Sequence, residues 1–218
     1  MKIEDVPKYH KIQTIWKREP EKPRRLIEGD WSCPEFQYLR NNTWLFSEKV
    51  DGTNIRVAWD AGDKSICIGG RTERAQIPAS LVARTLELFT VEKLLSVFPE
   101  NQVFLFGEGY GAKIQKGGGN YKSDGVDFVL FDISIGRWWL KREDVEGIAQ
   151  RLGIKMIPFV GAGILLDAIK LCEKGFNSQW GDFLAEGIVM RPAVELQDRA
   201  GRRIIAKIKH KDFCEEKQ

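Results

Sequence analysis

Apolar residues alternate with polar ones along several short segments of the chain, which is the pattern of β-strands with one buried face. In residues 54–59 the apolar side chains fall at Ile55, Val57 and Trp59. An Asp-Gly pair at positions 51–52 separates this segment from an earlier one, and Asp-Gly in that setting is a hairpin signal. Strands are predicted at residues 44–49, 54–59, 66–70, 102–107, 126–133, 186–191 and 203–209.

Three further segments carry apolar residues at the three- and four-residue spacing of an amphipathic helix. They cover residues 79–89, 141–152 and 164–172. Because the strands come in groups and the helices fall irregularly between them, the order predicts an α+β fold with antiparallel β-sheets flanked by helices. Residues 17–25 are charged and interrupted by prolines, which predicts an exposed loop.

Composition narrows the class of protein. Of the 218 residues, 43% are apolar, and 12 Phe and 7 Trp supply a large buriable surface, which excludes a disordered chain. The net charge is only +3, so any contact with nucleic acid has to come from a local basic cluster. The 4 cysteines are widely spaced and only 2 histidines occur, which argues against zinc motifs, a disulfide framework and a histidine-centred triad.

The chain also lacks an apolar run long enough to span a membrane and an apolar segment of the signal-peptide type. We therefore expect no membrane association. The expected location is the cytoplasm, or the host cytoplasm if a phage encodes the protein.

Several basic residues are placed where they could do chemistry. Lys49 ends a predicted strand just before a glycine turn; taken alone, such a lysine is more often a solvated hairpin residue. As a nucleophile its amine must be uncharged, and neighbouring cations favour that form. In residues 203–211 the two-residue period places Arg203, Lys207, Lys209 and Lys211 on one face, as a polyphosphate would require.

Two carboxylates and one arginine also stand at the ends of predicted strands. Glu108 follows an apolar strand in a Phe-Gly-Glu-Gly sequence, and Glu186 begins the sequence Glu-Gly-Ile-Val-Met-Arg-Pro. Arg71 follows two glycines. Each of them alone is typical of an exposed strand end, so only their joint occurrence in this order is informative.

Taken in order, these residues resemble the motifs of the covalent nucleotidyltransferase superfamily of polynucleotide ligases and RNA-capping enzymes. The most similar branch is the RNA ligase 2 type, which includes phage double-strand RNA ligases and kinetoplastid editing ligases. The similar segments, from motif I to motif V, are residues 49–54, 70–72, 106–108, 127–133, 185–192 and 206–209. Asn54 favours this branch, because DNA ligases and capping enzymes usually carry arginine there.

The resemblance implies the ligase adenylation fold and an ATP-dependent RNA ligase. Lys49 would attack the α-phosphate of ATP and carry AMP, which would pass to a 5′-phosphate before a 3′-hydroxyl seals the strand. Lys207 and Lys209 would bind the phosphates and stabilise charge on the transferred phosphoryl group. Glu186 would hold a divalent cation, Mg²⁺ or Mn²⁺, which prefers oxygen ligands and retains waters.

The same resemblance implies a set of residues that bind the nucleotide. Glu108 would accept a hydrogen bond from the ribose, and Phe131 would stack on the adenine. Glu48 would help to read the adenine edge. Asn54 and Arg71 would orient the phosphate or the end of the polynucleotide.

Residues 111–125 mix glycines with three lysines and a tyrosine, which indicates a mobile surface loop or a nucleic-acid contact. Gln115 and Lys116 are the candidates for binding RNA, at a nick or a broken strand end, with DNA as an open alternative. Further along, Trp138 and Trp139 are adjacent, and the two-residue period of a strand predicts that only one of them packs inward.

The motifs lie within residues 44–213, and residues 1–218 are expected to form a single adenylyltransferase domain. Nine residues follow Lys209, so no C-terminal OB-fold or helical domain is expected, and a partner protein is a candidate to supply one. On this expectation, adenylylation of Lys49 is more robust than recognition of unadenylylated ends. Two alternatives stay open: a small DNA ligase or capping-type guanylyltransferase, and a non-catalytic module that binds nucleotides or RNA ends.

Overall fold

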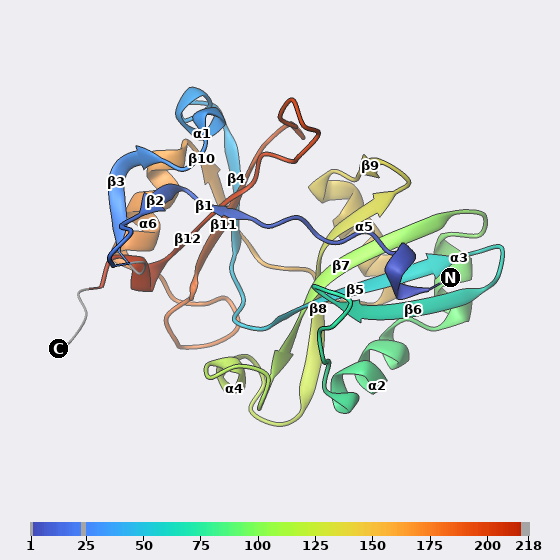
Figure 1. Cartoon of the computed structure of the whole chain (residues 1–218). Helices are drawn as coiled ribbons and strands as arrows, with labels where there is room; N and C mark the ends of the chain where they lie inside the picture. The colour runs from blue at the N-terminus through green and yellow to red at the C-terminus, as the bar shows by residue number, and fades with distance from the viewer. Residues whose placement is uncertain (1, 23–24, 215–218) are drawn as a thin grey trace. The chain divides into compact units, whose positions relative to one another are not determined.

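The computed structural model describes residues 2–22 and 25–214, and the chain divides into two compact units. The first unit consists of Met1–Tyr9 and Asp51–Ile157, and the second of His10–Val50 and Pro158–Gln218. Each unit has its own five-stranded sheet and its own hydrophobic core (Figure 1). The expectation of one adenylyltransferase domain over residues 1–218 stays a prediction.

The first unit is built on an antiparallel sheet with the strand order β6-β5-β7-β8-β9 (Figure 1). The strands are β5 (Thr53–Asp60), β6 (Ser65–Gly70), β7 (Gln102–Gly111), β8 (Val126–Ile135) and β9 (Trp138–Trp139). Ile55, Val57 and Trp59 of β5 all lie in the core of this unit. The alternation that predicted this strand therefore also identifies its buried face.

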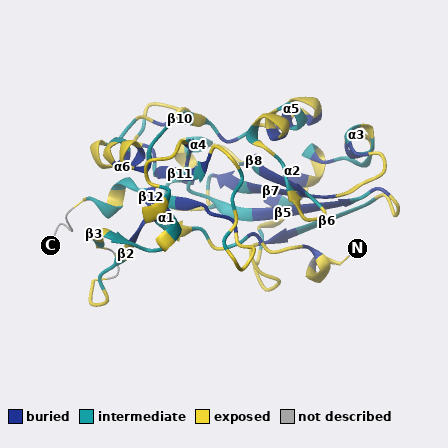
Figure 2. Cartoon of the chain, turned by 90° about the horizontal axis from the view of Figure 1, so that it is seen from above, coloured by how far each residue is buried: buried dark blue, intermediate teal, exposed yellow. Residues whose placement is uncertain are grey.

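Helices cover the core side of this sheet. They are α2 (Ala79–Leu88), α3 (Val91–Val97) and α5 (Arg142–Leu152). Leu81, Leu94 and Val145 bring apolar contacts from the three helices to the core. Figure 2 shows the buried strands β5, β7 and β8 and the exposed outer surfaces of these helices. Gly153 adopts a left-handed conformation (φ +67°) and ends α5, in agreement with the predicted helix end at residue 152.

The second unit contains a mixed sheet with the strand order β1-β12-β11-β4-β10. Its strands are β1 (Gln13–Thr14), β4 (Trp44–Glu48), β10 (Phe159–Gly163), β11 (Gly187–Pro192) and β12 (Ala206–Lys209). β1 runs parallel to β12, and the other neighbours are antiparallel. Helix α6 (Leu165–Lys174) packs Leu165, Ile169 and Cys172 into the core of this unit.

Short elements complete both units. In the second unit they are the two-stranded sheet of β2 (Trp16–Arg18) and β3 (Leu26–Trp31), the helix α1 (Pro34–Tyr38) and the 3₁₀-helix η2 (His210–Asp212). In the first unit they are the 3₁₀-helix η1 (Ile3–Asp5) and the one-turn helix α4 (Gly118–Tyr121). Within the described residues, no helix has the length and apolar character that crossing a bilayer requires.

The α+β class and the antiparallel sheets that the sequence predicts are present, with three local differences. The hairpin predicted at Asp51 and Gly52 is wrong, because β4 pairs with β10 and β11 whereas β5 pairs with β6 and β7 in a different sheet. β12 begins at Ala206, because Arg203 before it forms only an isolated bridge and its side chain is buried in a two-point ion pair with Glu195. Arg203 therefore does not belong to the predicted row of cations, and neither does Lys211, which lies in η2 beyond the end of β12. The predicted loop at 17–25 is partly β2, and residues 23–24 lie outside the described part of the chain.

Candidate active site

Neighbouring strands of the second unit bring together residues that are far apart in the sequence. β11 lies between β4 and β12, and Gly187 is paired with Lys209. Lys49 follows directly after β4, and Glu186 directly precedes β11. The backbone N–H of Lys49 donates to the carbonyl of Gly187 (2.9 Å), which fixes the start of the turn beside Glu186.

The carboxylate of Glu186 bridges two lysines. Lys49 Nζ donates to Glu186 Oε2 at 2.6 Å, and Lys209 Nζ lies 2.6 Å from Glu186 Oε1. The side chains of Lys49, Glu186 and Lys209 are 20%, 14% and 22% exposed, so these ion pairs are largely shielded from solvent. This arrangement concentrates an amine, a carboxylate and a second cation within a single hydrogen-bonded cluster.

Lys207 lies on the same strand, two residues before Lys209, so both side chains project from one face of β12. Lys207 is half-buried, whereas Ala206 and Ile208 on the other face belong to the core. The predicted alternation therefore holds for this part of the strand.

Glu48 is a buried carboxylate, only 1% exposed, at the end of β4. Ser178 Oγ donates to one of its oxygens, and the backbone N–H of Gln179 donates to the other at 2.9 Å. Burial raises the pKa of the Glu48 carboxyl, and the two hydrogen bonds partly oppose this rise. Gln179 Nε2 also donates to the carbonyl of Phe159 at 2.7 Å. Together with the two hydrogen bonds to Glu48, this contact holds the loop that leads to Glu186.

In the first unit, Asn54 and Glu108 lie directly opposite each other on β5 and β7. Both belong to the sheet face that points away from the core, because Ile55 next to Asn54 points into it. The side-chain oxygen of Asn54 is buried and, among the described residues, has no hydrogen-bond partner. A buried acceptor without a donor is uncommon, and a polar ligand at this position would supply one.

The turn that leads into β5 requires a glycine at position 52. A Cβ on Gly52 would lie 2.3 Å from the carbonyl oxygen of Gly109 and 2.7 Å from Cγ of Glu108. These distances are shorter than van der Waals contacts allow, so only glycine fits at this position. The glycine of the Lys-x-Asp-Gly sequence therefore lets the backbone pass close to β7.

Phe131 occupies an irregular position on β8. Asp132 is paired with Phe106, but Leu130 is paired with the next residue, Gly107. Phe131 is therefore the extra residue of a β-bulge, a feature that redirects a side chain and is frequent next to active sites. The Phe131 side chain is half-buried.

The remaining predicted contacts of the first unit are exposed. Arg71 follows β6, and Gln115 and Lys116 come shortly before α4. Tyr121, in contrast, is half-buried, and its hydroxyl accepts a hydrogen bond from the backbone N–H of Asp51 at 3.3 Å. The segment that carries Gln115 and Lys116 is thus attached to the turn that follows Lys49 in the sequence.

The two adjacent tryptophans behave as the strand period predicts. Trp138 is 79% exposed, whereas Trp139 is half-buried and packs edge-on against Tyr9 at a centroid distance of 5.7 Å. The prediction that only one of them packs inward is confirmed.

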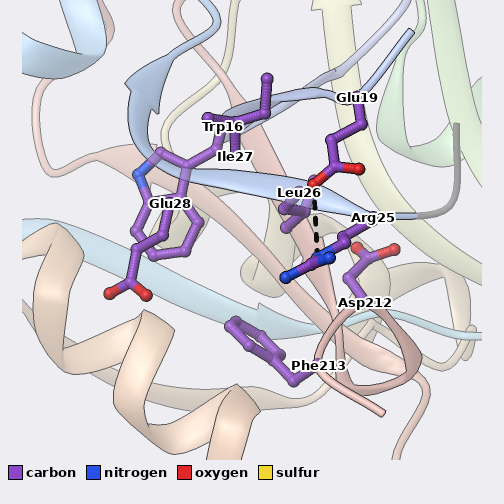
Figure 3. Close-up of a pocket in the computed structure, with 8 residues that line it drawn as sticks. All are labelled: Trp16, Glu19, Arg25, Leu26, Ile27, Glu28, Asp212 and Phe213. Atoms are coloured by element: carbon purple, nitrogen blue, oxygen red, sulfur yellow. Dashed lines mark ion pairs between the residues drawn. The ribbon is translucent and has the colours of Figure 1, made fainter. Parts of the chain in front are cut away.

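A cavity of about 360 Å³ lies elsewhere in the second unit, between β2, β3 and η2 (Figure 3). Its lining residues are Trp16, Glu19, Arg25, Leu26, Ile27, Glu28, Asp212 and Phe213. Glu19 pairs with Arg25 (3.3 Å), and Asp212 pairs with Arg18 (2.9 Å). None of the residues predicted from the sequence to form the site lines this cavity, so it is not assigned to the reaction.

The predicted site residues are divided between the two units. The second unit contains Glu48, Lys49, Glu186, Lys207 and Lys209, and the first contains Asn54, Arg71, Glu108, Gln115, Lys116 and Phe131. Ser178, Gln179 and Tyr9 were missed, because no motif or periodicity marks them; their roles arise only from tertiary contacts.

The antiparallel α+β architecture and the lysine–glutamate–lysine cluster define a protein with the RNA ligase nucleotidyltransferase fold. The chain belongs to the RNA ligase family, whose family model matches residues 42–209. No curated protein matches the sequence.

Solved structures support the fold. A Naegleria gruberi RNA ligase with pyrophosphate is 20% identical, has a TM-score of 0.63, and the match covers 81% of this chain and 52% of that one. Alanine variants of that ligase, one apo and one with ATP and Mn, are both 17% identical, with TM-scores of 0.68 and 0.67. Their matches cover 95% and 94% of this chain but only 56% of theirs, so this chain spans little more than half of those proteins.

Proposed function

We propose that this protein is an ATP-dependent RNA ligase that joins 5′-phosphate and 3′-hydroxyl ends, at nicks, through a covalent lysyl-AMP and an adenylylated polynucleotide. Membership of the RNA ligase family supports this proposal. The observation that carries it is the bridge from Lys49 through Glu186 to Lys209, which brings three motif residues into one cluster.

Lys49 is the nucleophile of this proposal. Its Nζ attacks the α-phosphorus of ATP, a P–N bond forms, and the bond to pyrophosphate breaks. The attacking amine must first be uncharged, because only the neutral amine has a lone pair to attack with. Lys209 and Lys207 then stabilise the negative charge that spreads over the transferred phosphoryl group.

Glu186 is the residue that would hold a divalent cation. Among the described residues no group of three or more His, Cys, Asp or Glu side chains is placed to bind a metal. A single carboxylate fits Mg²⁺ or Mn²⁺, because such ions keep several waters and share their coordination with substrate phosphates. When bound, the ion supplies positive charge that neutralises phosphate oxygens.

The nucleoside is assigned to the residues that the family resemblance indicates. Glu108 accepts a hydrogen bond from the ribose, and Phe131 stacks on the adenine. Glu48 reads the adenine edge with the acceptor capacity that remains beside Ser178 and Gln179, since an ionised carboxylate offers about four lone-pair sites. Asn54, whose buried side-chain oxygen has no partner among the described residues, and Arg71 orient the phosphate or the polynucleotide end.

RNA is the proposed polynucleotide, with Gln115 and Lys116 as contacts to its backbone. Both side chains are exposed and therefore open to a large ligand. A phosphate contact by Lys116 would be electrostatic and sensitive to salt.

Labelling of the protein tests the first chemical step. Wild-type protein, Lys49→Ala and Lys211→Ala are incubated with α-labelled ATP and Mg²⁺ or Mn²⁺, then denatured. Lys211 is an exposed lysine of the neighbouring 3₁₀-helix and serves as the matched control. We expect an acid-labile, alkali-stable label on wild type and Lys211→Ala only. Absence of label from the wild type overturns the proposal in favour of a non-catalytic binding module.

Reactions with different substrates then distinguish RNA ligase, DNA ligase and capping activity. Nicked duplexes with an RNA or a DNA 3′-hydroxyl strand are offered in pairs, and α-labelled GTP replaces ATP in a parallel reaction. Sealing of the RNA nick with ATP is the expected result. Preferential sealing of DNA would indicate a DNA ligase, and labelling by GTP a capping-type enzyme.

A further inference from the structure

The β-bulge at Phe131 leaves this side chain without the regular support of a paired strand position. A bulged residue lies outside the ladder, so its direction depends on what packs against it. In the first unit, one residue that packs against the ring of Phe131 comes from the N-terminal segment. The centroids of Tyr9 and Phe131 are 5.0 Å apart and the rings meet edge to face.

Tyr9 also contacts the residue pair next to this bulge. Its hydroxyl donates to Asp132 Oδ2 at 2.7 Å, and its ring lies against Phe106, the residue paired with Asp132 (centroid distance 5.2 Å). Tyr9 and Asp132 are 8% and 2% exposed, so this hydrogen bond is formed away from solvent. Loss of the Tyr9 hydroxyl would therefore remove a buried hydrogen bond to a carboxylate.

A second attachment holds the same segment on the sheet. Arg56 is fully buried on β5, and its Nη1 donates to the carbonyl of Val6 at 2.6 Å. Its Nε donates to the carbonyl of Gly70 at 2.7 Å, immediately before Arg71. The backbone at Val6 is therefore fixed three residues before Tyr9, which limits the freedom of the Tyr9 ring.

From these contacts we infer that Tyr9 is a positioning residue for the nucleobase: it holds the bulged Phe131 ring in the orientation that stacks on adenine. The inference deepens the proposed function and rests on it. A Phe131 ring that is already oriented loses less conformational entropy when the adenine binds. The contact with Tyr9 should therefore increase the affinity for the nucleotide. Tyr9 itself touches no reacting atom and leaves the phosphoryl-transfer step to Lys49 and its partners.

The test is the kinetics of Lys49 labelling as a function of ATP concentration. Tyr9→Leu removes the ring and the hydroxyl, and Tyr9→Phe removes only the hydroxyl. We expect the KM for ATP to rise about fivefold in Tyr9→Leu and about twofold in Tyr9→Phe, the range of one aromatic contact. The maximal labelling rate should stay within about twofold, because uniform binding energy is what is lost. Tyr38→Leu is the control, since Tyr38 is 86% exposed.

A double-mutant cycle shows whether Tyr9 acts through Phe131. Phe131→Leu and the double variant Tyr9→Leu/Phe131→Leu are measured in the same way. If Tyr9 works only by orienting Phe131, adding Tyr9→Leu to Phe131→Leu changes KM by less than about twofold. Fully multiplicative effects overturn the inference, as does an unchanged KM in Tyr9→Leu. Because the conservative Tyr9→Phe keeps the packed ring, it keeps the question answerable if Tyr9→Leu fails to fold.

The two proposals fail in different ways. If the wild-type protein is not labelled by ATP, the proposed ligase function fails. If the wild type is labelled but Tyr9 variants lose maximal rate with no change of KM, only the role of Tyr9 fails, and its contacts then serve folding alone.

Discussion

Glu186 pairs with two cations in the candidate site, because each of its oxygens meets a different lysine. Glu186→Gln keeps the shape and removes the charge. We expect the rate of Lys49 labelling to fall by about 100-fold or more, as when one preorganised electrostatic contact is removed from an active site. The measurement is the initial rate of label transfer across a range of Mn²⁺ concentrations.

Glu173→Gln, an exposed substitution on α6, is the control for that experiment. It should label at the wild-type rate. Wild-type behaviour of Glu186→Gln would remove Glu186 from the reaction.

Glu48 makes the free energy of unfolding depend on pH. Its pKa is raised in the folded state, so folding favours the protonated form. The contribution of Glu48 to folding stability is fully present below the pKa of the unfolded state, near 4.5, and is lost as the pH rises through the pKa of the folded state. Each unit of pKa difference corresponds to about 1.4 kcal/mol. Glu48→Gln, which cannot ionise, should therefore gain stability relative to wild type between pH 4.5 and 8.

Urea unfolding of both proteins at the two pH values measures this effect. The free-energy difference between Glu48→Gln and wild type is compared with that of Ser178→Ala, which keeps the carboxylate and removes one donor. A difference for Glu48→Gln that does not change with pH would contradict the assignment of the raised pKa.

Individual residues differed in how far the sequence revealed them. Lys49, Glu186 and Lys209 lie at strand ends beside turns, and their order resembles family motifs, so they could be named in advance. Ser178 and Tyr9 could not, because a loop and an N-terminal segment reach their partners only through the tertiary fold. Arg203 was misread because a two-residue period does not report a partner such as Glu195.

At the scale of elements, the close passage of the turn into β5 over β7 gives a prediction. Gly52→Ala would place a methyl group 2.3 Å from the carbonyl oxygen of Gly109 and 2.7 Å from Glu108 Cγ. The backbone has to move, which we expect to cost about 1–3 kcal/mol of stability, as overpacking does. Because Glu108 is displaced as well, the KM for ATP should also rise.

Gly147→Ala is the matched control in the same unit. Gly147 lies inside α5 and a Cβ there meets nothing within 4 Å, so this variant should gain about 0.5–1 kcal/mol. Thermal unfolding of the two variants measures the contrast. Equal stabilities of Gly52→Ala and wild type would show that the turn relaxes freely.

Strong alternation and helical spacing predicted β5, α2, α5 and α6, because each buries one regular face. The short elements escaped prediction for the opposite reason. β10 carries two glycines, and β1 and β2 are two and three residues long, so none of them offers a period to read. The bulge at Phe131 is also not marked in the sequence, where the apolar run 128–131 is followed directly by Asp132 and nothing indicates an extra residue.

At the scale of the whole molecule, the family match and the fold extend across both units, while the net charge is only +3. Binding of RNA therefore has to depend on local cations, and each phosphate contact contributes a defined salt dependence. Lys116→Ala should weaken RNA binding and lower the slope of log K against log salt by about 0.7–0.9. The rate of Lys49 labelling by ATP should not change, because Lys116 is assigned to the polynucleotide and not to the nucleotide.

Fluorescence anisotropy with a labelled nicked RNA, at several salt concentrations, measures that slope. Gln115→Ala should weaken binding without changing the slope, since it removes a hydrogen bond and no charge. Lys170→Ala, an exposed lysine of α6, should leave both affinity and slope at wild-type values. An unchanged slope in Lys116→Ala would show that the segment before α4 does not contact the RNA phosphates. Because labelling and RNA binding are read out separately, that result would leave the lysyl-AMP chemistry standing.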